Sequence, residues 1–320
     1  MPSISQLKYI VTVARLEHFG KAAKYCRIAQ PSLSIQIQKA EEELGIVIFD
    51  RNKKPVVPTA RGHTVLEHAQ AVLREHERLL IASKKLEGEI VGDLTVGIIP
   101  TILPYLLPFF LKRFSQSFPK LDLTVEEMKT EDIVNALRTD QIDAGILATP
   151  LLEKGIREKV LYYEEFLAYF HKGHPLGKRK NIQSQNLGAN DIWLLKDGHC
   201  LRNQVTNLCT PKQSSRAFDN VRFEGGSLET LRNLIRTSHG FTLVPWTFAR
   251  NLSAEERKRQ TKSFVTPAPL REVSLVYSRD QWKKEQIEAL RRTIVESLPK
   301  DIKQSYESRN QIIGIDSESQ

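Results

Sequence analysis

The spacing of apolar residues changes once along this chain, at Gly88, and this change limits the folds it can adopt. From Ile4 to Leu86, apolar residues recur at the three- and four-residue intervals of helices, with almost no strand-like alternation. After Gly88, short β-rich runs such as DLTVGII, DAGILAT and FTLVPW alternate with helical stretches. The pattern predicts an all-helical head followed by an α/β body with largely parallel sheets, in two or three folded units.

Two helices separated by a short break predict a helix-turn-helix inside the head. We expect the first helix over Ala22–Ile28, a tight turn at Gln30-Pro31, and a second helix from Ser32 to Leu44 that ends at Gly45. One face of the second helix carries side chains suited to reading base edges, namely Ser34, Gln36, Gln38 and Lys39. The other face is expected to supply the core through Leu33, Ile35, Ile37, Ala40 and Leu44.

A basic wing follows the second helix. Arg51, Lys53 and Lys54 precede Pro55, and cations there can contact phosphates without reading sequence. The alternative is an ordinary three-helix module with a solvated basic loop.

The stretch from Thr59 to Leu86 is too long for a simple connector and has an amphipathic helical pattern. Its apolar positions are Val65, Leu66, Ala69, Val72, Leu73, Leu79 and Leu80. A second copy of the same helix is the natural partner for this stripe, so we expect a dimer. A helix packed on its own domain is the alternative.

Charge and cysteine content narrow the class of protein. The net charge is +9 with a pI near 9.4. Residues 1–90 hold 14 Lys/Arg against 10 Asp/Glu, a net +4. This positive charge favours a polyanionic partner.

The N-terminus lacks the apolar stretch of a signal peptide, and the longest apolar run, Ile98–Leu111, contains three prolines and is too short for a membrane helix. Three cysteines fit neither a disulfide framework nor a zinc site. We therefore expect a cytoplasmic protein without a metal or cofactor.

The run FGKAAKYCRIAQPSLSIQIQKAEEELGIVIFDR, followed by PTARG, resembles the head of LysR-type transcriptional regulators. The resemblance implies a winged helix-turn-helix, a dimerising linker helix and an effector domain of two Rossmann-like α/β lobes, as in periplasmic binding proteins. It also implies promoter DNA and RNA polymerase as partners and a homodimer or homotetramer. The family's DNA contacts carry over to Gln30, Pro31, Ser32, Ser34, Gln36 and Lys39. The implied domains are 1–58 for DNA binding, 59–88 for the linker, 89–300 for the regulatory domain with its second lobe at about 166–268, and 301–320 as a flexible tail.

The segment KDGHCLRNQVTNLC resembles the element of the peroxide-sensing OxyR branch of that family. The resemblance implies that Cys200 is the peroxidatic cysteine, that Cys209 is the resolving cysteine and that hydrogen peroxide is the signal. A thiolate is the reactive species, so we expect His199, Arg202 and the amino end of a helix starting near Leu201 to lower the pKa of Cys200.

The spacing of the two cysteines has a mechanical consequence. A sulfenic acid at Cys200 would condense with Cys209 to give a reversible disulfide. If residues 201–208 are helical, the two cysteines lie on opposite faces and about 13 Å apart along the axis, whereas a disulfide needs Cα atoms within about 7 Å. Closing the bridge would therefore unwind or bend this segment and signal to the dimer.

Further matches suggest the peroxide pocket. The loop IPTILPYLLP implicates Thr101, weaker matches point to Thr130, Asp143 and Arg271, and FEGGSLETLRNLI resembles the pocket edge of the second lobe, with a helix from Ser227. The residues around Val221 to Gly226 and the polar tail depart from the OxyR pattern.

Two other functions remain open. One is a LysR-type regulator that responds to a small organic effector and whose cysteines are incidental. The other is an enzyme, a thiol peroxidase, which the absence of a Cys-x-x-Cys motif disfavours. We expect no enzyme activity and no redox role for Cys26.

Overall fold

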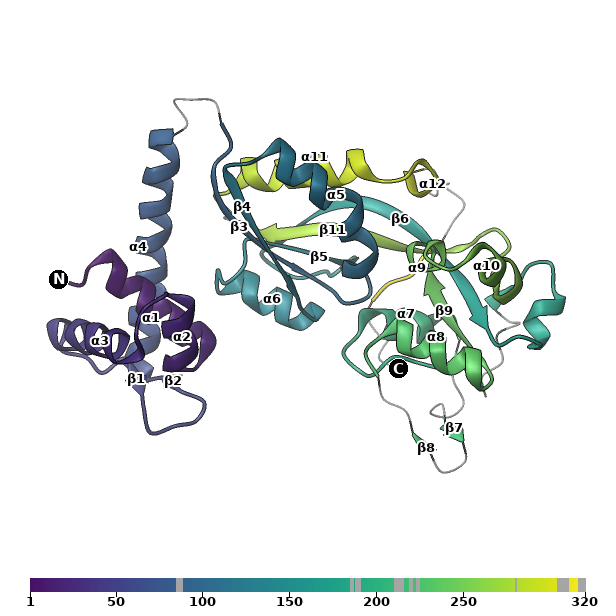
Figure 1. The fold of residues 1–320 in the computed structure, drawn as a ribbon, viewed down its shortest axis with the longest axis horizontal. Coiled ribbons are helices and arrows are strands. Elements are labelled where there is room, and N and C mark those ends of the chain that lie inside the picture. The colour runs from purple at the N-terminus through teal and green to yellow at the C-terminus, as the bar shows by residue number, and fades with distance from the viewer. Residues whose placement is uncertain are drawn as a thin grey trace. The chain divides into compact units, whose positions relative to one another are not determined.

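The computed structural model describes residues 1–84, 89–184, 187, 191–209, 216–218, 221–222, 225–279, 281–303 and 311–315. It divides into two compact units, Met1–Glu89 and Ile90–Gln320 (Figure 1). Residues 85–88 of the expected linker, and 304–310 and 316–320 of the expected tail, lie outside the described residues.

The first unit is helical with a short β-hairpin. Its elements are α1 (Ile4–Leu16), α2 (Phe19–Tyr25), α3 (Gln30–Leu44), β1 (Phe49–Asp50), β2 (Val57–Pro58) and α4 (Ala60–Lys84). Helix α3 begins two residues before the expected start, because Pro31 occupies its first turn, where a proline costs no hydrogen bond. Gly45 ends this helix in the left-handed conformation, at φ 65°. The turn of the helix-turn-helix therefore precedes Gln30.

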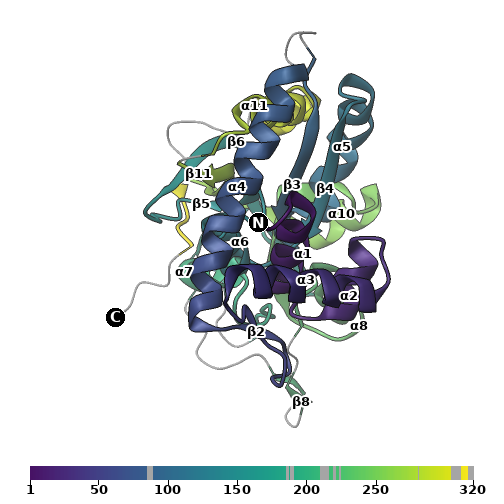
Figure 2. The same ribbon diagram turned by 90° about the vertical axis from the view of Figure 1, so that its left-hand side faces the viewer.

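Helix α4 packs against α1 and extends well beyond α1, α2 and α3 (Figure 2). Leu66 and Ala69 are buried in this unit, whereas Val72 and Leu79 are 47% and 66% exposed. The apolar stripe is thus covered only at the amino end of the helix. No helix in the described part of the chain combines the length and the hydropathy needed to cross a membrane.

The second unit has two lobes built on one eight-stranded mixed sheet. The first lobe contains β3 (Gly92–Ile98), α5 (Leu103–Ser117), β4 (Leu121–Glu127), α6 (Thr130–Arg138), β5 (Ala144–Thr149), β11 (Pro269–Ser278), α11 (Lys284–Ser297) and α12 (Lys300–Lys303). The second contains η2 (Pro175–Lys178), α7 (Cys200–Leu208), β7 (Arg216–Phe218), β8 (Val221–Arg222), α8 (Leu228–Thr237), β9 (Phe241–Pro245), α9 (Trp246–Arg250), α10 (Ala254–Gln260) and β10 (Thr261–Ser263).

The long strand β6 (Ile156–Phe170) belongs to both lobes. Its first two thirds pair with β11, and its last five residues pair with β9. In the first lobe, β3 pairs in parallel with β4 and β5, as the βαβ pattern of the sequence predicts.

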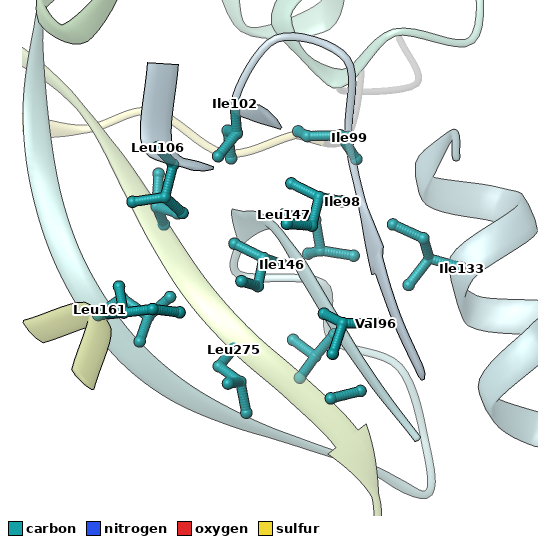
Figure 3. Packing of buried hydrophobic residues seen from close by; sticks show 14 of the residues in the cluster. Val96, Ile98, Ile99, Ile102, Leu106, Ile133, Ile146, Leu147, Leu161 and Leu275 are labelled. Atoms are coloured by element: carbon teal, nitrogen blue, oxygen red, sulfur yellow. The ribbon is translucent and has the colours of Figure 1, made fainter. Parts of the chain in front are cut away.

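Each lobe has its own apolar core. In the first, Val96, Ile146 and Leu275 from three neighbouring strands meet Ile133 of α6 and Leu106 of α5 (Figure 3). All six residues of β5 are buried, which explains its continuous apolar sequence. The predicted fold class, a helix-turn-helix head followed by a two-lobed α/β domain, is confirmed. The expectation of largely parallel sheets is wrong, because β6 pairs antiparallel with β9, β10 and β11, and β11 pairs antiparallel with β5.

The C-terminal segment differs from the expected loose tail. Within the described residues 311–315, β12 (Gln311–Ile312) pairs in parallel with β11, and Ile313 and Ile315 are buried. The small apolar patch IIGI is therefore a packed edge of the second unit. Its short length gives no periodicity from which this packing could be predicted.

Candidate functional site

Helix α7 carries one cysteine at each end. Cys200 is its first residue, and Cys209 is the residue that caps its carboxyl end. Cys200 packs in the core of the first lobe and Cys209 in that of the second, and both thiols are free. Nine residues of helix separate the two by about 13 Å and half a turn, so the geometry expected from the spacing is present.

Thr130 contacts the thiol of Cys200 directly. It is the first residue of α6, and its hydroxyl oxygen Oγ1 forms a hydrogen bond with Sγ of Cys200. When the sulfur is an anion, this hydroxyl is the donor. The side chain expected from a weak sequence match thus lies at the thiol.

Arg271 is fully buried and links Thr101 to the site. Its Nη1 donates to Oγ1 of Thr101 at 3.1 Å, and Nη2 donates to the Thr101 carbonyl at 3.3 Å. The positive charge of Arg271 opposes the rise in the pKa of Cys200. Thr130 and Arg271 therefore act on one sulfur atom, and Thr101 is bound to Arg271.

Glu164 neutralises this arginine, and it was not identified from the sequence. Nε and Nη2 of Arg271 donate to its Oε1 at 2.9 and 2.6 Å. Its Oε2 accepts from the backbone N–H and the hydroxyl of Thr247, at 3.1 and 2.6 Å. The available signal was the pair Glu164-Glu165 within the apolar run 161–170 of this strand, since adjacent strand residues face opposite sides and one of the two lies on the buried side.

The thiol of Cys200 has a pKa that is raised, not lowered as we expected. Burial of the side chain raises it, and the Thr130 hydrogen bond and the charge of Arg271 only partly oppose this. Burial and the nearby Lys129 lower the pKa of His199, so its imidazole is neutral near pH 7 and supplies no positive charge. Burial also raises the pKa of Cys209 to about 12. Desolvation exceeds the favourable charges in this reduced form.

Arg202 and Asp143 bind groups other than the Cys200 thiol. Arg202 donates to the Leu195 carbonyl at 2.7 Å and pairs with Asp197 at 2.6 Å, so it fixes the loop that leads into α7. Asp143 pairs with Lys283 at 3.1 Å and accepts from the backbone N–H of Thr95. It precedes β5, whereas Arg271 aligns near the opposite end of that strand, roughly 20 Å away. The expectation that Asp143 surrounds the peroxide pocket is wrong.

Two cavities flank His199. One, of about 400 Å³, is lined by Cys200, Thr130, His199, Asn135, Leu151 and Ile315, among others. The other, of about 550 Å³, lies between the lobes and includes Tyr105, Lys129, His199, Ser227 and Glu229. Gly226 packs so closely on the imidazole that a Cβ there would lie 2.8 Å from Nε2. Within the described residues, no group of three His, Cys, Asp or Glu side chains is placed to hold a metal ion.

The candidate DNA-reading face lies on α3. Gln30, Pro31, Ser32 and Lys39 are exposed, and Ser34 and Gln36 are half-buried. Gln36 accepts from Gln6 through both its side-chain oxygen, at 3.2 Å, and its carbonyl, at 3.3 Å. Part of its hydrogen-bonding capacity is therefore already used inside the domain.

Ile35 and Leu44 are not core residues as we expected. They are 53% and 38% exposed, whereas Leu33 and Ile37 are fully buried. Each helical residue turns the side chain by about 100°, so Ile35 points away from the face that its neighbours two positions either side share. Ile35 instead joins the outer face, where an apolar side chain can contact a thymine methyl.

The basic wing is partly committed to contacts within the domain. Arg51 donates to Ser34 at 3.1 Å and pairs with Glu41 at 2.9 Å, and Glu41 also accepts from the backbone of Ile48. Lys53 and Lys54 are exposed. Glu41, which holds the wing against α3, is a further residue that the sequence reading missed.

The chain matches two family descriptions. Residues 4–63 match the bacterial regulatory helix-turn-helix protein, lysR family, and residues 87–299 match the LysR substrate binding domain. The second match alone spans about two thirds of the chain.

Curated relatives and solved structures agree with these matches. The chain is 33% identical over 275 residues to the hydrogen peroxide-inducible genes activator of Haemophilus influenzae, covering 86% of this chain and 90% of that protein. It is also 33% identical to the DNA-binding transcriptional dual regulator OxyR of Escherichia coli, covering 86% and 89%. A full-length OxyR variant from Pseudomonas aeruginosa superposes with a TM-score of 0.74 at 30% identity, covering 92% and 98%. A hydrogen-peroxide-bound OxyR mutant from Corynebacterium glutamicum gives 0.61 at 31%, covering 93% and 92%.

Proposed function

The chain belongs to the LysR family of transcriptional regulators, and we propose that it regulates an oxidative-stress response as a DNA-binding activator switched by hydrogen peroxide. One observation supports this most directly. The two thiols lie at opposite ends of one helix and pack in different cores. The thiol at the amino end contacts Thr130, and the positive charge of Arg271 opposes the rise in its pKa that burial causes.

The proposed chemistry begins at Cys200. Its sulfur bonds to one peroxide oxygen while the O–O bond breaks, and the departing oxygen leaves as water after taking up the thiol proton. Thr130 donates to the anionic sulfur, and Arg271 with Thr101 polarises the leaving oxygen. Peroxide is reduced and the sulfur becomes a sulfenic acid.

Cys209 then resolves the intermediate. Its sulfur bonds to that of Cys200, the S–O bond breaks, and a second water leaves, so two thiols and one peroxide yield a disulfide and two waters. Because a disulfide needs Cα atoms within about 7 Å, α7 must lose its helical form. Cys200 packs in the core of the first lobe and Cys209 in the core of the second, so the disulfide between them changes the packing of the regulatory unit.

The protonation of the reduced protein follows from the burial of the Cys200 thiol. A raised pKa keeps Cys200 mostly protonated at neutral pH and limits its reaction with other oxidants. The cavity of about 400 Å³ beside the thiol is large enough to admit hydrogen peroxide.

The DNA contacts proposed for the head are on α3 and the wing. Ser32, Ser34, Gln36 and Lys39 would meet base edges or phosphates in the major groove, with Gln30 and Pro31 at the amino end of the helix. Arg51, Lys53 and Lys54 would contact phosphates. We propose a homodimer, or a tetramer built from dimers, joined through the exposed stripe of α4, and RNA polymerase as a partner at promoters in the cytoplasm.

Mass mapping of the thiols before and after a stoichiometric dose of hydrogen peroxide, with DNA footprinting on the same samples, tests the proposal. We expect a Cys200 to Cys209 disulfide and a changed footprint, both lost in Cys200→Ser and both kept in the matched control Cys26→Ser. Free thiols and an unmoved footprint in the native protein would refute it.

The cavity between the lobes supports a second function. Lys129, Ser227 and Tyr105 offer polar groups to a small organic effector in a space of about 550 Å³. A response to such a molecule that survives Cys200→Ser would favour this regulator class over the peroxide switch.

A further inference from the structure

We propose that residues 311–315, named here the C-terminal strap, hold α7 in its helical form and must leave it before Cys200 and Cys209 can join. This inference rests on the proposed disulfide switch. The strap lies beyond residue 299, where the match to the LysR substrate binding domain ends.

Backbone hydrogen bonds fix one side of the strap to the first lobe. The N–H of Gln311 donates to the Ala268 carbonyl at 3.1 Å, and the N–H of Ile313 donates to the Leu270 carbonyl at 2.9 Å. Ala268 directly precedes β11 and Leu270 belongs to it, and β11 is paired with both β5 and β6. The strap is therefore attached to a well-supported part of the sheet.

Three side-chain amides of α7 hold the other side. Asn203, Gln204 and Asn207 donate to the carbonyls of Ile315, Ile313 and Gly314, at 3.1, 2.8 and 3.3 Å. Positions i, i+1 and i+4 share one face only while the segment is helical. Three successive carbonyls of the strap are thus matched to the helical form of α7.

The strap also reaches the surroundings of both cysteines. Ile313 packs in the second-lobe core with Cys209, and Ile315 packs in the first-lobe core with Cys200. Ile315 also lines the cavity of about 400 Å³ next to the Cys200 thiol. The five residues therefore bridge the two ends of the switch helix.

Disulfide closure and these contacts exclude each other. Closure removes the helical spacing that aligns the three amides, so each bond that the strap makes to α7 favours the reduced form. Gln204 is fully buried, and among the described residues its Oε1 has no hydrogen-bond partner. Its Nε2 donates to the Ile313 carbonyl of the strap, so a substitution at Gln204 removes a bond to the strap.

The test separates the two oxidation steps in Gln204→Met and in a chain ending at residue 310. The methionine keeps the volume of the side chain and removes the donor. Matched controls are Gly314→Ala, whose added Cβ would meet no atom within 4 Å, and a chain ending at residue 315. Sulfenic acid at Cys200 is trapped chemically, and the disulfide is followed by quenched mass mapping.

We expect unchanged sulfenic acid formation and faster closure, by roughly fivefold for Gln204→Met and more than about tenfold for the shortened chain, from the bonds lost. Disulfide closure at the native rate in both variants would refute the proposed role of the strap. Hydrogen exchange of α7 in the reduced protein gives a readout that needs no peroxide, since both variants should exchange faster than their controls. If the native protein forms no disulfide, the peroxide function fails, and the exchange rates still decide whether the strap holds α7.

Discussion

Replacing Thr130 by valine tests how the buried thiol of Cys200 becomes reactive. Valine has nearly the shape of threonine and lacks the hydroxyl that contacts Sγ. Burial already raises the pKa of this thiol, and the Thr130 hydrogen bond is the largest effect that opposes burial. The substitution should therefore raise the pKa of Cys200 further and slow its attack on peroxide.

The size of the effect follows from the strength of the lost bond. A hydrogen bond to a charged partner contributes about 1.5–3 kcal/mol, and 1.36 kcal/mol corresponds to about one pKa unit. The pKa should rise by about one to two units, and the thiolate fraction below the pKa should fall about 10- to 100-fold. The rate of sulfenic acid formation at neutral pH should fall by the same factor. The rates of the two proteins should converge once the pH exceeds the pKa of the variant.

The assay is the pH dependence of sulfenic acid formation with excess peroxide, measured by rapid quenching and trapping. Thr139→Val is the matched control, because Thr139 lies at the other end of α6 and its hydroxyl donates to the Asn135 carbonyl. The same pH profile for Thr130→Val as for the native protein would refute the assigned role of this hydroxyl. A slower rate that persists at high pH would instead indicate a damaged pocket.

Four further outcomes are expected. Cys209→Ser should accumulate sulfenic acid at Cys200 without a disulfide, and an intramolecular disulfide in this variant would contradict the resolving role. Glu164→Ala leaves the charge of Arg271 buried and unpaired, so denaturant unfolding of the regulatory unit should show a loss of about 3–5 kcal/mol; a loss below about 1 kcal/mol would show that the pair is not needed. Leu79→Glu places a charge in the exposed stripe of α4 and should weaken dimers in sedimentation, whereas an unchanged association constant would remove α4 from the interface. Lys39→Ala should weaken promoter binding and reduce the salt slope by about one, and a slope equal to that of the native protein would exclude a phosphate contact.

Local features of the sequence were sufficient for several conclusions. The helix-turn-helix and the β/α alternation depend on the spacing of apolar residues along a few turns or strands, and the structure has both. The positions of Cys200 and Cys209 at the two ends of one helix follow from the same kind of local spacing. Helical geometry then gives their separation without knowledge of the rest of the fold.

Contacts between residues far apart in the sequence determine the partners of the buried polar groups, and these partners could not be predicted from the sequence. Glu164 meets Arg271 across 107 positions, and Gln204 meets Ile313 across 109. The chemical type of a residue does not show which distant group it will bind, and so Asp143 was assigned to a site that it does not reach. The pKa of Cys200 was expected to fall because its charged neighbours in the sequence were visible, whereas its burial was not. Desolvation depends on how the whole chain packs around a group, and only the tertiary structure determines it.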